Sequence, residues 1–209
     1  MVVFDLYGTL LDVSGMAARM SAALGKDASP MLAAWRIEQL ERTWELNRLG
    51  SYEPFDQVTA WALTKVAGEL DAAMRAKLTS EWLTVPPHPD ALEALQRLRA
   101  AGVRTATLSN GTRQMIERAL FAAGITIDEV RSADEVRVYK PDPRVYALLD
   151  DLAPRDQQLF VSSNAFDADG AKRDGRAVLV IHRGGARPTL APDFEVHSLA
   201  EMAAVVAAT

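Results

Sequence analysis

The segment Val2-Val3-Phe4-Asp5-Leu6-Tyr7-Gly8-Thr9-Leu10 runs from an apolar stretch through a carboxylate into a tight turn. Consecutive apolar residues bounded by a charge and a glycine indicate a buried strand that ends at Asp5. A carboxylate at the end of such a strand is in a position to attack a bound substrate, so Asp5 is a candidate nucleophile. An aspartate could equally cap the following turn, and this stretch alone leaves both interpretations open.

Short apolar segments alternate with helical patterns along much of the chain. Two helical patterns each stop before a glycine, at Gly102 and Gly124, as helices often do. This alternation predicts an α/β fold with a doubly wound, mainly parallel, Rossmann-like sheet. Ligands bind at the carboxyl ends of the strands in such sheets, and Asp5, Ser109 and Ser162 all fall at such ends. The predicted strands cover residues 2–5, 103–109, 159–163 and 177–182.

Residues 14–86 interrupt the alternation, because they carry helical signals and no strand candidate. The proline-rich segment 85–89 marks the point where this region ends. We interpret residues 14–86 as a helical cap domain inserted into a core domain of residues 1–13 plus 87–209. A cap over the strand ends could close the crevice and exclude water from it.

The composition narrows the class of function. The 209 residues carry a net charge of -5 with acids and bases interspersed, so we expect a small-molecule ligand and neither nucleic acid nor a membrane as a partner. The chain has no cysteine, and His88, His182 and His197 are too scattered to suggest a metal cluster. No apolar stretch approaches membrane-spanning length, and Asp5 interrupts what would be a signal-peptide core, so we expect a cytoplasmic protein.

Three later segments, taken with Asp5, resemble the motifs of a known family. In their order and spacing they resemble the haloacid dehalogenase superfamily and, within it, the L-2-haloacid dehalogenases. The segment from Trp35-Arg36 to Trp44 is also similar to the cap of that family. A lone D-x-Y-G-T would be unspecific, whereas five segments in order are specific. The three later segments are Leu108-Ser109-Asn110-Gly111, Tyr139-Lys140-Pro141-Asp142-Pro143-Arg144-Val145-Tyr146 and Phe160-Val161-Ser162-Ser163-Asn164-Ala165-Phe166-Asp167.

The resemblance implies hydrolytic dehalogenation of short-chain (S)-2-haloacids to (R)-2-hydroxyacids plus halide. Asp5 would displace the halide and form an ester, which water activated near Asp167 would then hydrolyse. The configuration inverts because a single displacement occurs at the chiral carbon and the second step does not touch it. The preference for the L enantiomer rests on the resemblance alone.

The resemblance also implies the catalytic residues. Lys140 stands before a turn that should begin a helix, where a positive charge is disfavoured unless a carboxylate such as Asp5 lies nearby. Composition alone would favour an exposed loop lysine. The polar residues after the third strand could simply cap a helix, but the resemblance gives them the task of positioning water, with Asp169 expected on the helix surface. The predicted catalytic residues are Asp5, Thr9, Lys140, Ser162, Asn164 and Asp167.

A second set of residues would bind the halide, the carboxylate and the alkyl group. Arg36 lies on an apolar stripe with no acid at helical spacing, so it is either a snorkelling arginine or an anion hook, and we favour the hook. The resemblance implies that Arg36 and Asn110 bind the halide and that Ser109 binds the substrate carboxylate. It also implies that Tyr146 orients Lys140. Aromatic and leucine residues are more often plain core, and we expect the four tryptophans to be cap packing. The predicted set is Tyr7, Arg36, Leu40, Phe55, Ser109, Asn110, Tyr146 and Phe166.

Tyr7 and Ser163 stand where the phosphatase branch of the superfamily carries acids. In that branch magnesium helps neutralise a phosphate dianion, and an acid protonates the leaving alkoxide. Halide is a very weak base that leaves unprotonated, and a 2-haloacid is a monoanion that one fixed cation such as Lys140 could neutralise. We therefore expect no metal ion and no cofactor.

Two other functions stay open at the level of the sequence. One is a phosphatase acting on a small phosphorylated metabolite, which would need a metal despite Tyr7 and Ser163. The other is a catalytically silent binding protein of the same fold, against which the retained polar set argues. Relatives suggest a homodimer, while the sequence does not predict the preferred halogen or chain length.

Overall fold

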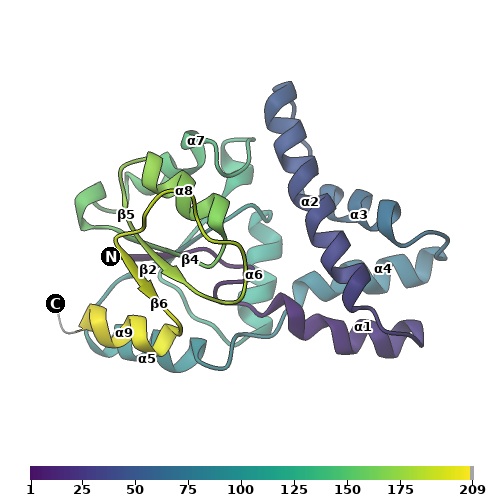
Figure 1. Ribbon diagram of the computed structural model, residues 1–209, viewed down its shortest axis with the longest axis horizontal. Helices are drawn as coiled ribbons and strands as arrows, with labels where there is room; N and C mark the ends of the chain where they lie inside the picture. Colours follow the sequence, from purple (N-terminus) through teal and green to yellow (C-terminus); the bar gives the residue numbers. More distant parts are fainter. Residues whose placement is uncertain (208–209) are drawn as a thin grey trace.

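The computed structural model describes residues 1–207 and contains a six-stranded sheet in the order β3-β2-β1-β4-β5-β6 (Figure 1). Every neighbouring pair of strands is parallel. The chain starts in the middle of the sheet, builds outward to β3 and then continues from β4 on the other side of β1, so the prediction of a doubly wound parallel sheet is confirmed. The strands are β1 (Val2–Phe4), β2 (Thr105–Ser109), β3 (Glu129–Ser132), β4 (Leu159–Ser162), β5 (Ala177–Ile181) and β6 (Phe194–Val196).

The central strands are buried and the edge strands are not. Every residue of β1 and β2 is buried, which explains why β1 reads as an uninterrupted apolar run. The edge strands β3 and β6 were not predicted from the sequence. They are short and only partly buried, and they carry charged residues such as Arg131 and Glu195, so their composition is that of a loop.

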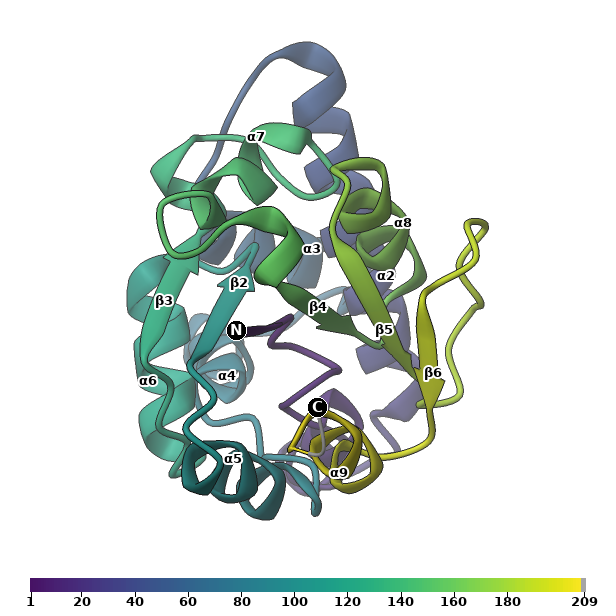
Figure 2. The same ribbon diagram turned by 90° about the vertical axis from the view of Figure 1, so that its left-hand side faces the viewer.

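Helices cover both faces of the sheet. Helices α5 and α9 pack against each other on one face, while α7 and α8 lie on the other (Figures 1 and 2). As predicted, α5 and α6 end just before glycines in the left-handed conformation, Gly102 at φ 71° and Gly124 at φ 65°. These helices are α5 (Ala91–Ala100), α6 (Arg113–Ala122), α7 (Pro143–Tyr146), α8 (Ala165–Arg173) and α9 (Leu199–Ala207).

Four further helices, here called the cap helices, stand together beside the sheet (Figure 1). The longest is α2, which packs along α3 and runs for 21 residues. It has a proline in its first turn and ends at Gly50, whose φ of 63° terminates the helix. The cap helices are α1 (Met16–Leu24), α2 (Ser29–Leu49), α3 (Phe55–Val66) and α4 (Ala72–Ser80).

The two connections between the sheet and the cap helices run side by side. Leu11 pairs with Pro87 in an antiparallel bridge. The Asp12 N–H donates to the Pro86 carbonyl at 2.7 Å, and the His88 N–H donates to the Leu10 carbonyl at 2.9 Å. The chain therefore leaves and re-enters the sheet region at one point, beside the end of β1. Short 3-10 turns complete the description: η1 (Val13–Gly15), η2 (Glu81–Leu83), η3 (Ala133–Glu135), η4 (Ala147–Leu149) and η5 (Arg155–Gln157).

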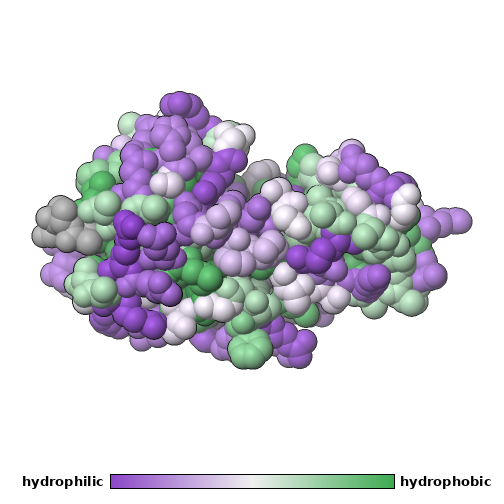
Figure 3. All heavy atoms as spheres, turned by 90° about the horizontal axis from the view of Figure 1, so that it is seen from below, coloured by the Kyte–Doolittle hydropathy of each residue, from purple (hydrophilic) through white to green (hydrophobic). Residues whose placement is uncertain are grey.

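Within residues 1–207, no helix has both the length and the apolar character needed to cross a membrane. Figure 3 shows polar and apolar residues interspersed over the face that it draws. The large hydrophobic side chains that remain exposed are spread over several elements, with Phe121 on α6, Phe194 on β6, and Ile37, Trp44 and Leu49 on α2.

Candidate active site

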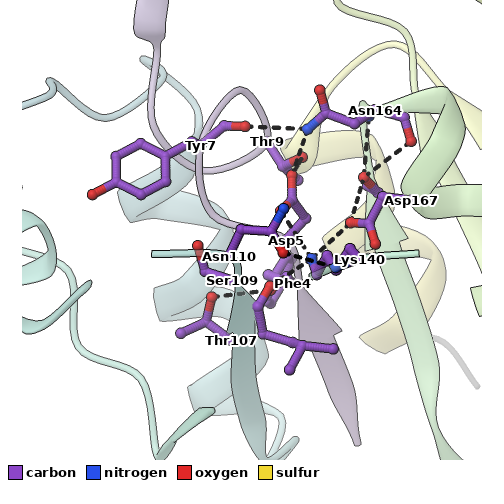
Figure 4. Close-up of polar contacts among 12 residues, drawn as sticks. Phe4, Asp5, Tyr7, Thr9, Thr107, Ser109, Asn110, Lys140, Asn164 and Asp167 are labelled. Atoms are coloured by element: carbon purple, nitrogen blue, oxygen red, sulfur yellow. Dashed lines mark hydrogen bonds and ion pairs between the residues drawn. The ribbon is translucent and has the colours of Figure 1, made fainter. Parts of the chain in front are cut away.

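Asp5 is the first residue after β1, and its carboxylate accepts three hydrogen bonds (Figure 4). Thr9 Oγ1 and Asn164 Nδ2 donate to Asp5 Oδ2 at 3.0 and 2.6 Å. Lys140 Nζ donates to Asp5 Oδ1 at 3.1 Å. Only 7% of Asp5 is exposed, so these fixed donors rather than bulk water orient the carboxylate. This is the arrangement that an attacking carboxylate needs.

Lys140 is buried between two carboxylates. Its Nζ donates to Asp5 Oδ1, to Asp167 Oδ2 at 2.8 Å and to the Leu108 carbonyl at 2.7 Å, so each ammonium proton has an acceptor. Burial disfavours the charged form, but Asp167 and Asp5 outweigh that effect and raise the pKa of Lys140. The side chain is therefore a permanent cation inside the molecule.

Asp167, on the first turn of α8, is fully buried. Tyr146 OH donates to its Oδ1 at 2.7 Å, and Ser162 Oγ donates to its Oδ2 at 3.2 Å. Burial raises the pKa of Asp167 to about 6, against the opposing effect of the nearby Lys140 charge. Tyr146 was predicted to orient Lys140, and its hydroxyl binds the Asp167 carboxylate, which is itself an acceptor of the lysine ammonium group.

The loop after β4 is bonded to the loop after β1. The Ser163 N–H donates to Thr9 Oγ1 at 2.9 Å, and Ser163 Oγ donates to the Gly8 carbonyl at 2.7 Å. Asn164 Nδ2 donates to the Tyr7 carbonyl at 3.1 Å as well as to Asp5. Gly8 adopts φ 93°, which favours glycine. These hydrogen bonds fix the side chains of Thr9 and Asn164, which both donate to the Asp5 carboxylate.

Ser109 is the last residue of β2 and Asn110 follows it, and within residues 1–207 the Ser109 hydroxyl and the Asn110 amide nitrogen donate to no acceptor. The Lys140 N–H donates to Asn110 Oδ1 at 2.9 Å. The Asn110 amide nitrogen, which carries two N–H donors, therefore points away from Lys140 N. Ser109 Oγ accepts from the Gly111 N–H at 3.2 Å, which leaves the hydroxyl proton for another acceptor. Both side chains can therefore donate to an anion.

Arg36 reaches the site from α2, the longest of the cap helices. It shares with Tyr7 and Asn164 a pocket of about 340 Å³ whose other lining residues are Gly8, Asp12, Val13, Ser14, His88, Ser163, Arg183 and Gly185. Burial lowers the pKa of Arg36, while Asp5, Tyr7 and Asp167 act in the opposite direction. No carboxylate within residues 1–207 forms an ion pair with this guanidinium.

Two tryptophans from residues 14–86 contact residues outside that range, although we expected the tryptophans to be cap packing. The Arg36 guanidinium lies 6.0 Å from the centroid of the Trp82 ring, which meets the Tyr7 ring edge to face at 5.7 Å. Tyr7 OH also donates to the Trp82 carbonyl at 3.1 Å. The Trp44 ring meets Phe166 edge to face at 5.8 Å. Sequence spacing carried no signal for these pairs, because each joins segments far apart in the chain.

The structure also places Phe55 and Leu40, which were predicted to bind the substrate, and Asp169, which was not. Phe55 is buried, with its ring 6.0 Å from that of Tyr139, the residue before Lys140. Leu40 is partly buried on the same helix as Arg36. Asp169 was expected on the helix surface, and this was wrong: only 6% of it is exposed. The reason is that the loop after β5 folds back over α8, so that Thr189 and Leu190 donate to the Asp169 carboxylate.

The residues present do not fit the magnesium site of the phosphatase branch. Within residues 1–207, no group of three or more His, Cys, Asp or Glu could hold a metal ion. Lys140 Nζ occupies the space between Asp5 and Asp167. The hydroxyls of Tyr7 and Ser163, at the positions of the missing acids, are bonded to backbone carbonyls. The positive charge at this site is supplied by a side chain.

Comparisons with known proteins agree with this geometry. The family model described as haloacid dehalogenase-like hydrolase matches residues 1–175. The chain is 38% identical to (S)-2-haloacid dehalogenase H-109 from Pseudomonas putida, over 96% of this chain and 95% of the relative. It is also 38% identical to (S)-2-haloacid dehalogenase from Pseudomonas sp. strain YL, over 95% and 90% of the two chains.

Among solved structures, the fold matches L-2-haloacid dehalogenase from Xanthobacter autotrophicus with chloropropionic acid covalently bound. The TM-score is 0.92 at 33% identity, and the match covers 98% of this chain and 97% of the other. Both the sequence matches and the structural match span nearly the whole chain. The chain belongs to the haloacid dehalogenase-like hydrolases and, within them, to the family of the (S)-2-haloacid dehalogenases.

Proposed function

We propose that this protein hydrolyses short-chain (S)-2-haloacids to (R)-2-hydroxyacids and halide through an ester on Asp5. The observation that carries the proposal is the Asp5 carboxylate, held by Thr9, Asn164 and Lys140 at the end of β1. Relatives at 38% identity are named (S)-2-haloacid dehalogenases. In a related solved structure chloropropionic acid is covalently bound, and a mechanism with an ester intermediate would produce such a covalent complex.

In the first step, Asp5 attacks the carbon that carries the halogen. A carboxylate oxygen forms the new C–O bond while the C–halogen bond breaks, and the electron pair of that bond leaves with the halide. The Ser109 hydroxyl donates to the substrate carboxylate. Arg36 and the free Asn110 amide group receive the halide, because both present donors without a competing acidic partner.

In the second step, water attacks the carbonyl carbon of the Asp5 ester. Asp167, with Ser162 and Asn164 beside it, takes one proton from that water as the hydroxyl adds to the carbonyl carbon. The ester C–O bond then breaks, the second proton of the water passes to the departing oxygen that Asp5 supplied, and Asp167 releases its proton to solvent. Lys140 stabilises the negative charge that develops on the ester carbonyl oxygen. With a pKa of about 6, Asp167 is ionised at pH 7 and available as a base.

The first experiment measures halide release from the two enantiomers of 2-chloropropionate, with and without excess EDTA. We expect release from the S enantiomer, unchanged by EDTA and by added magnesium, because Lys140 supplies the positive charge. A parallel assay with a small phosphate monoester and magnesium tests the phosphatase alternative. Phosphate release with a magnesium requirement, and no halide release, would overturn the proposal.

The second experiment follows oxygen, because direct attack by water would give the same inverted product. With enzyme in excess over substrate in oxygen-18 water, we expect an unlabelled product hydroxyl and a gain of mass in the peptide that contains Asp5. Over many turnovers the product should become labelled. Label in the hydroxyl on the first turnover, with the Asp5 peptide unchanged, would mean that Asp5 acts as a general base.

We further propose that residues 14–86 act as a cap domain over a core of residues 1–13 and 87–209. The support is that α2 brings Arg36 to the pocket lined by Tyr7 and Asn164. A cytoplasmic location and a homodimer also remain predictions. Cell fractionation tests the first, and sedimentation of the purified protein tests the second.

A further inference from the structure

Asn47, in the last turn of α2, binds both backbone groups of one core residue. Its Nδ2 donates to the Tyr139 carbonyl at 2.7 Å, and the Tyr139 N–H donates to Asn47 Oδ1 at 2.9 Å. The two residues are 92 positions apart in the chain. Because an N–H can only donate and a carbonyl can only accept, these partners fix the orientation of the amide. The pair joins a cap helix directly to the segment that carries Lys140.

Tyr139 immediately precedes Lys140, so this contact acts at the backbone of the buried cation. The Lys140 N–H is itself bonded to Asn110 Oδ1. Successive backbone groups are thus held by Asn47 and then by Asn110. A lysine has a flexible four-carbon stem, and the place of its ammonium group depends on where its backbone is fixed. Asn47 therefore contributes to the position of Lys140 Nζ between Asp5 and Asp167.

Other cap residues reinforce the same point of attachment. The Tyr52 ring stacks on the Tyr139 ring with centroids 5.3 Å apart. Tyr139 OH donates to the Glu53 carbonyl, and Tyr52 OH donates to Asp134 Oδ1 at 2.6 Å. This end of α2 is consequently fixed to the core, rather than free to swing away from it.

The same helix carries Arg36, three turns before Asn47. Eleven residues correspond to about three turns and about 16 Å along an α-helix, so the two side chains lie on the same face. Helix α2 is continuous from Ser29 to Leu49. Fixing Asn47 on Tyr139 therefore also sets how far Arg36 projects over the pocket next to Asp5.

We propose that Asn47 is a positioning residue that sets the cap cation Arg36 and the core cation Lys140 in register, so that the halide leaves opposite the attacking carboxylate. This inference rests on the proposed dehalogenase function. Asn47 itself touches neither substrate nor halide. It acts through the Tyr139 backbone on one side and through the rigid helix α2 on the other.

The test compares Asn47→Ala with Arg48→Ala, a matched control one residue further along α2 that is exposed and outside the site. We expect Asn47→Ala to lower kcat on (S)-2-chloropropionate about tenfold, with KM changed much less, because misplaced reacting groups lower the rate of the chemical step. Arg48→Ala should stay at the wild-type level. Normal kcat in a folded Asn47→Ala protein would overturn the inference.

A double-mutant cycle separates positioning from plain structural support. Because Asn47 acts in part through Arg36, Asn47→Ala should cost clearly less when Arg36 is already alanine than when it is present. Fully additive effects on kcat would contradict the proposed register between the two cations. Should Asn47→Ala fail to fold, Asn47→Asp serves the same cycle, since it keeps the size and the acceptor but cannot donate to the Tyr139 carbonyl when ionised.

A readout independent of activity is amide hydrogen exchange in the peptide that contains Tyr139 and Lys140. We expect faster exchange in Asn47→Ala than in Arg48→Ala or the wild type, because the Tyr139 N–H loses its acceptor. Unchanged exchange would show that the contact does not hold this backbone. A wild-type protein that releases no halide from any 2-haloacid would instead overturn the proposed function, so the two failures are distinguishable.

Discussion

The two cations of the site, Lys140 before α7 and Arg36 on the cap helix α2, differ in how completely they are paired. Lys140 Nζ has three acceptors, two of them carboxylates, and only 1% of the residue is exposed. Arg36 has an aromatic face beside it and no ion pair within residues 1–207. The charge of Lys140 is thus neutralised by acids of the protein itself, whereas the guanidinium of Arg36 can still pair with an anion.

The largest effect should follow from Lys140→Met, which removes the cation that two carboxylates share. Breaking a buried pair typically costs roughly 3–5 kcal/mol of stability, because the remaining charges are uncompensated. We also expect kcat to fall about 10³-fold, since the stabilising charge beside Asp5 is lost. Thermal unfolding and halide release measure the two effects, with the exposed Lys26→Met as the control. Loss of activity without loss of stability would contradict the description of Lys140 as fully paired.

Arg36→Ala should give a smaller loss of activity and little loss of stability. We expect kcat to fall about 10²-fold because the halide loses its main donor. The melting temperature should stay close to that of Arg48→Ala, since no ion pair is broken. Near-normal turnover in Arg36→Ala would mean that Arg36 is a snorkelling side chain that binds no halide. The proposed difference between the two cations would then be wrong.

Acid should affect the paired site through Asp167. Its pKa in the folded protein is raised to about 6, so the ionised base is present above that pH and is lost as the pH falls through it. One pH unit below, at pH 5, we expect turnover to fall about tenfold. The sign for stability is opposite, because a raised carboxyl pKa favours the folded state at low pH. A kcat profile that stays flat from pH 7 to pH 5 would exclude Asp167 as the base.

The smallest effect should follow from Trp82→Phe, which weakens the aromatic face beside Arg36. Within residues 1–207 the Trp82 indole nitrogen has no hydrogen-bond partner, so this substitution removes no hydrogen bond. The carbonyl that accepts from Tyr7 OH is kept. We expect kcat to fall about threefold, in line with the modest strength of cation–π contacts. The effect should vanish when Arg36 is already alanine, and an undiminished effect there would mean that Trp82 acts elsewhere.

Much of the core could be predicted because its signals are local. The apolar run before Asp5, the glycines after α5 and α6, and the turn before α7 each depend on residues close together in sequence. The edge strands β3 and β6 escaped prediction because their half-exposed, charged residues lack the pattern of a buried strand. Asp169 was misplaced for a similar reason, since its burial depends on a loop twenty residues later.

The order of the residues already specifies which chemical groups stand at the strand ends: the carboxylate of Asp5, the lysine before the Pro141 turn and the polar cluster after β4. How these groups meet depends on the packing of the whole chain. Lys140 reaches Asp5 across 135 positions of the chain, and Asn47 reaches Tyr139 across 92. Such contacts depend on how the sheet closes and how α2 docks, and no local pattern specifies them. Propensity and periodicity act over a few residues, whereas the pairing of buried charges is settled only when the whole chain has packed.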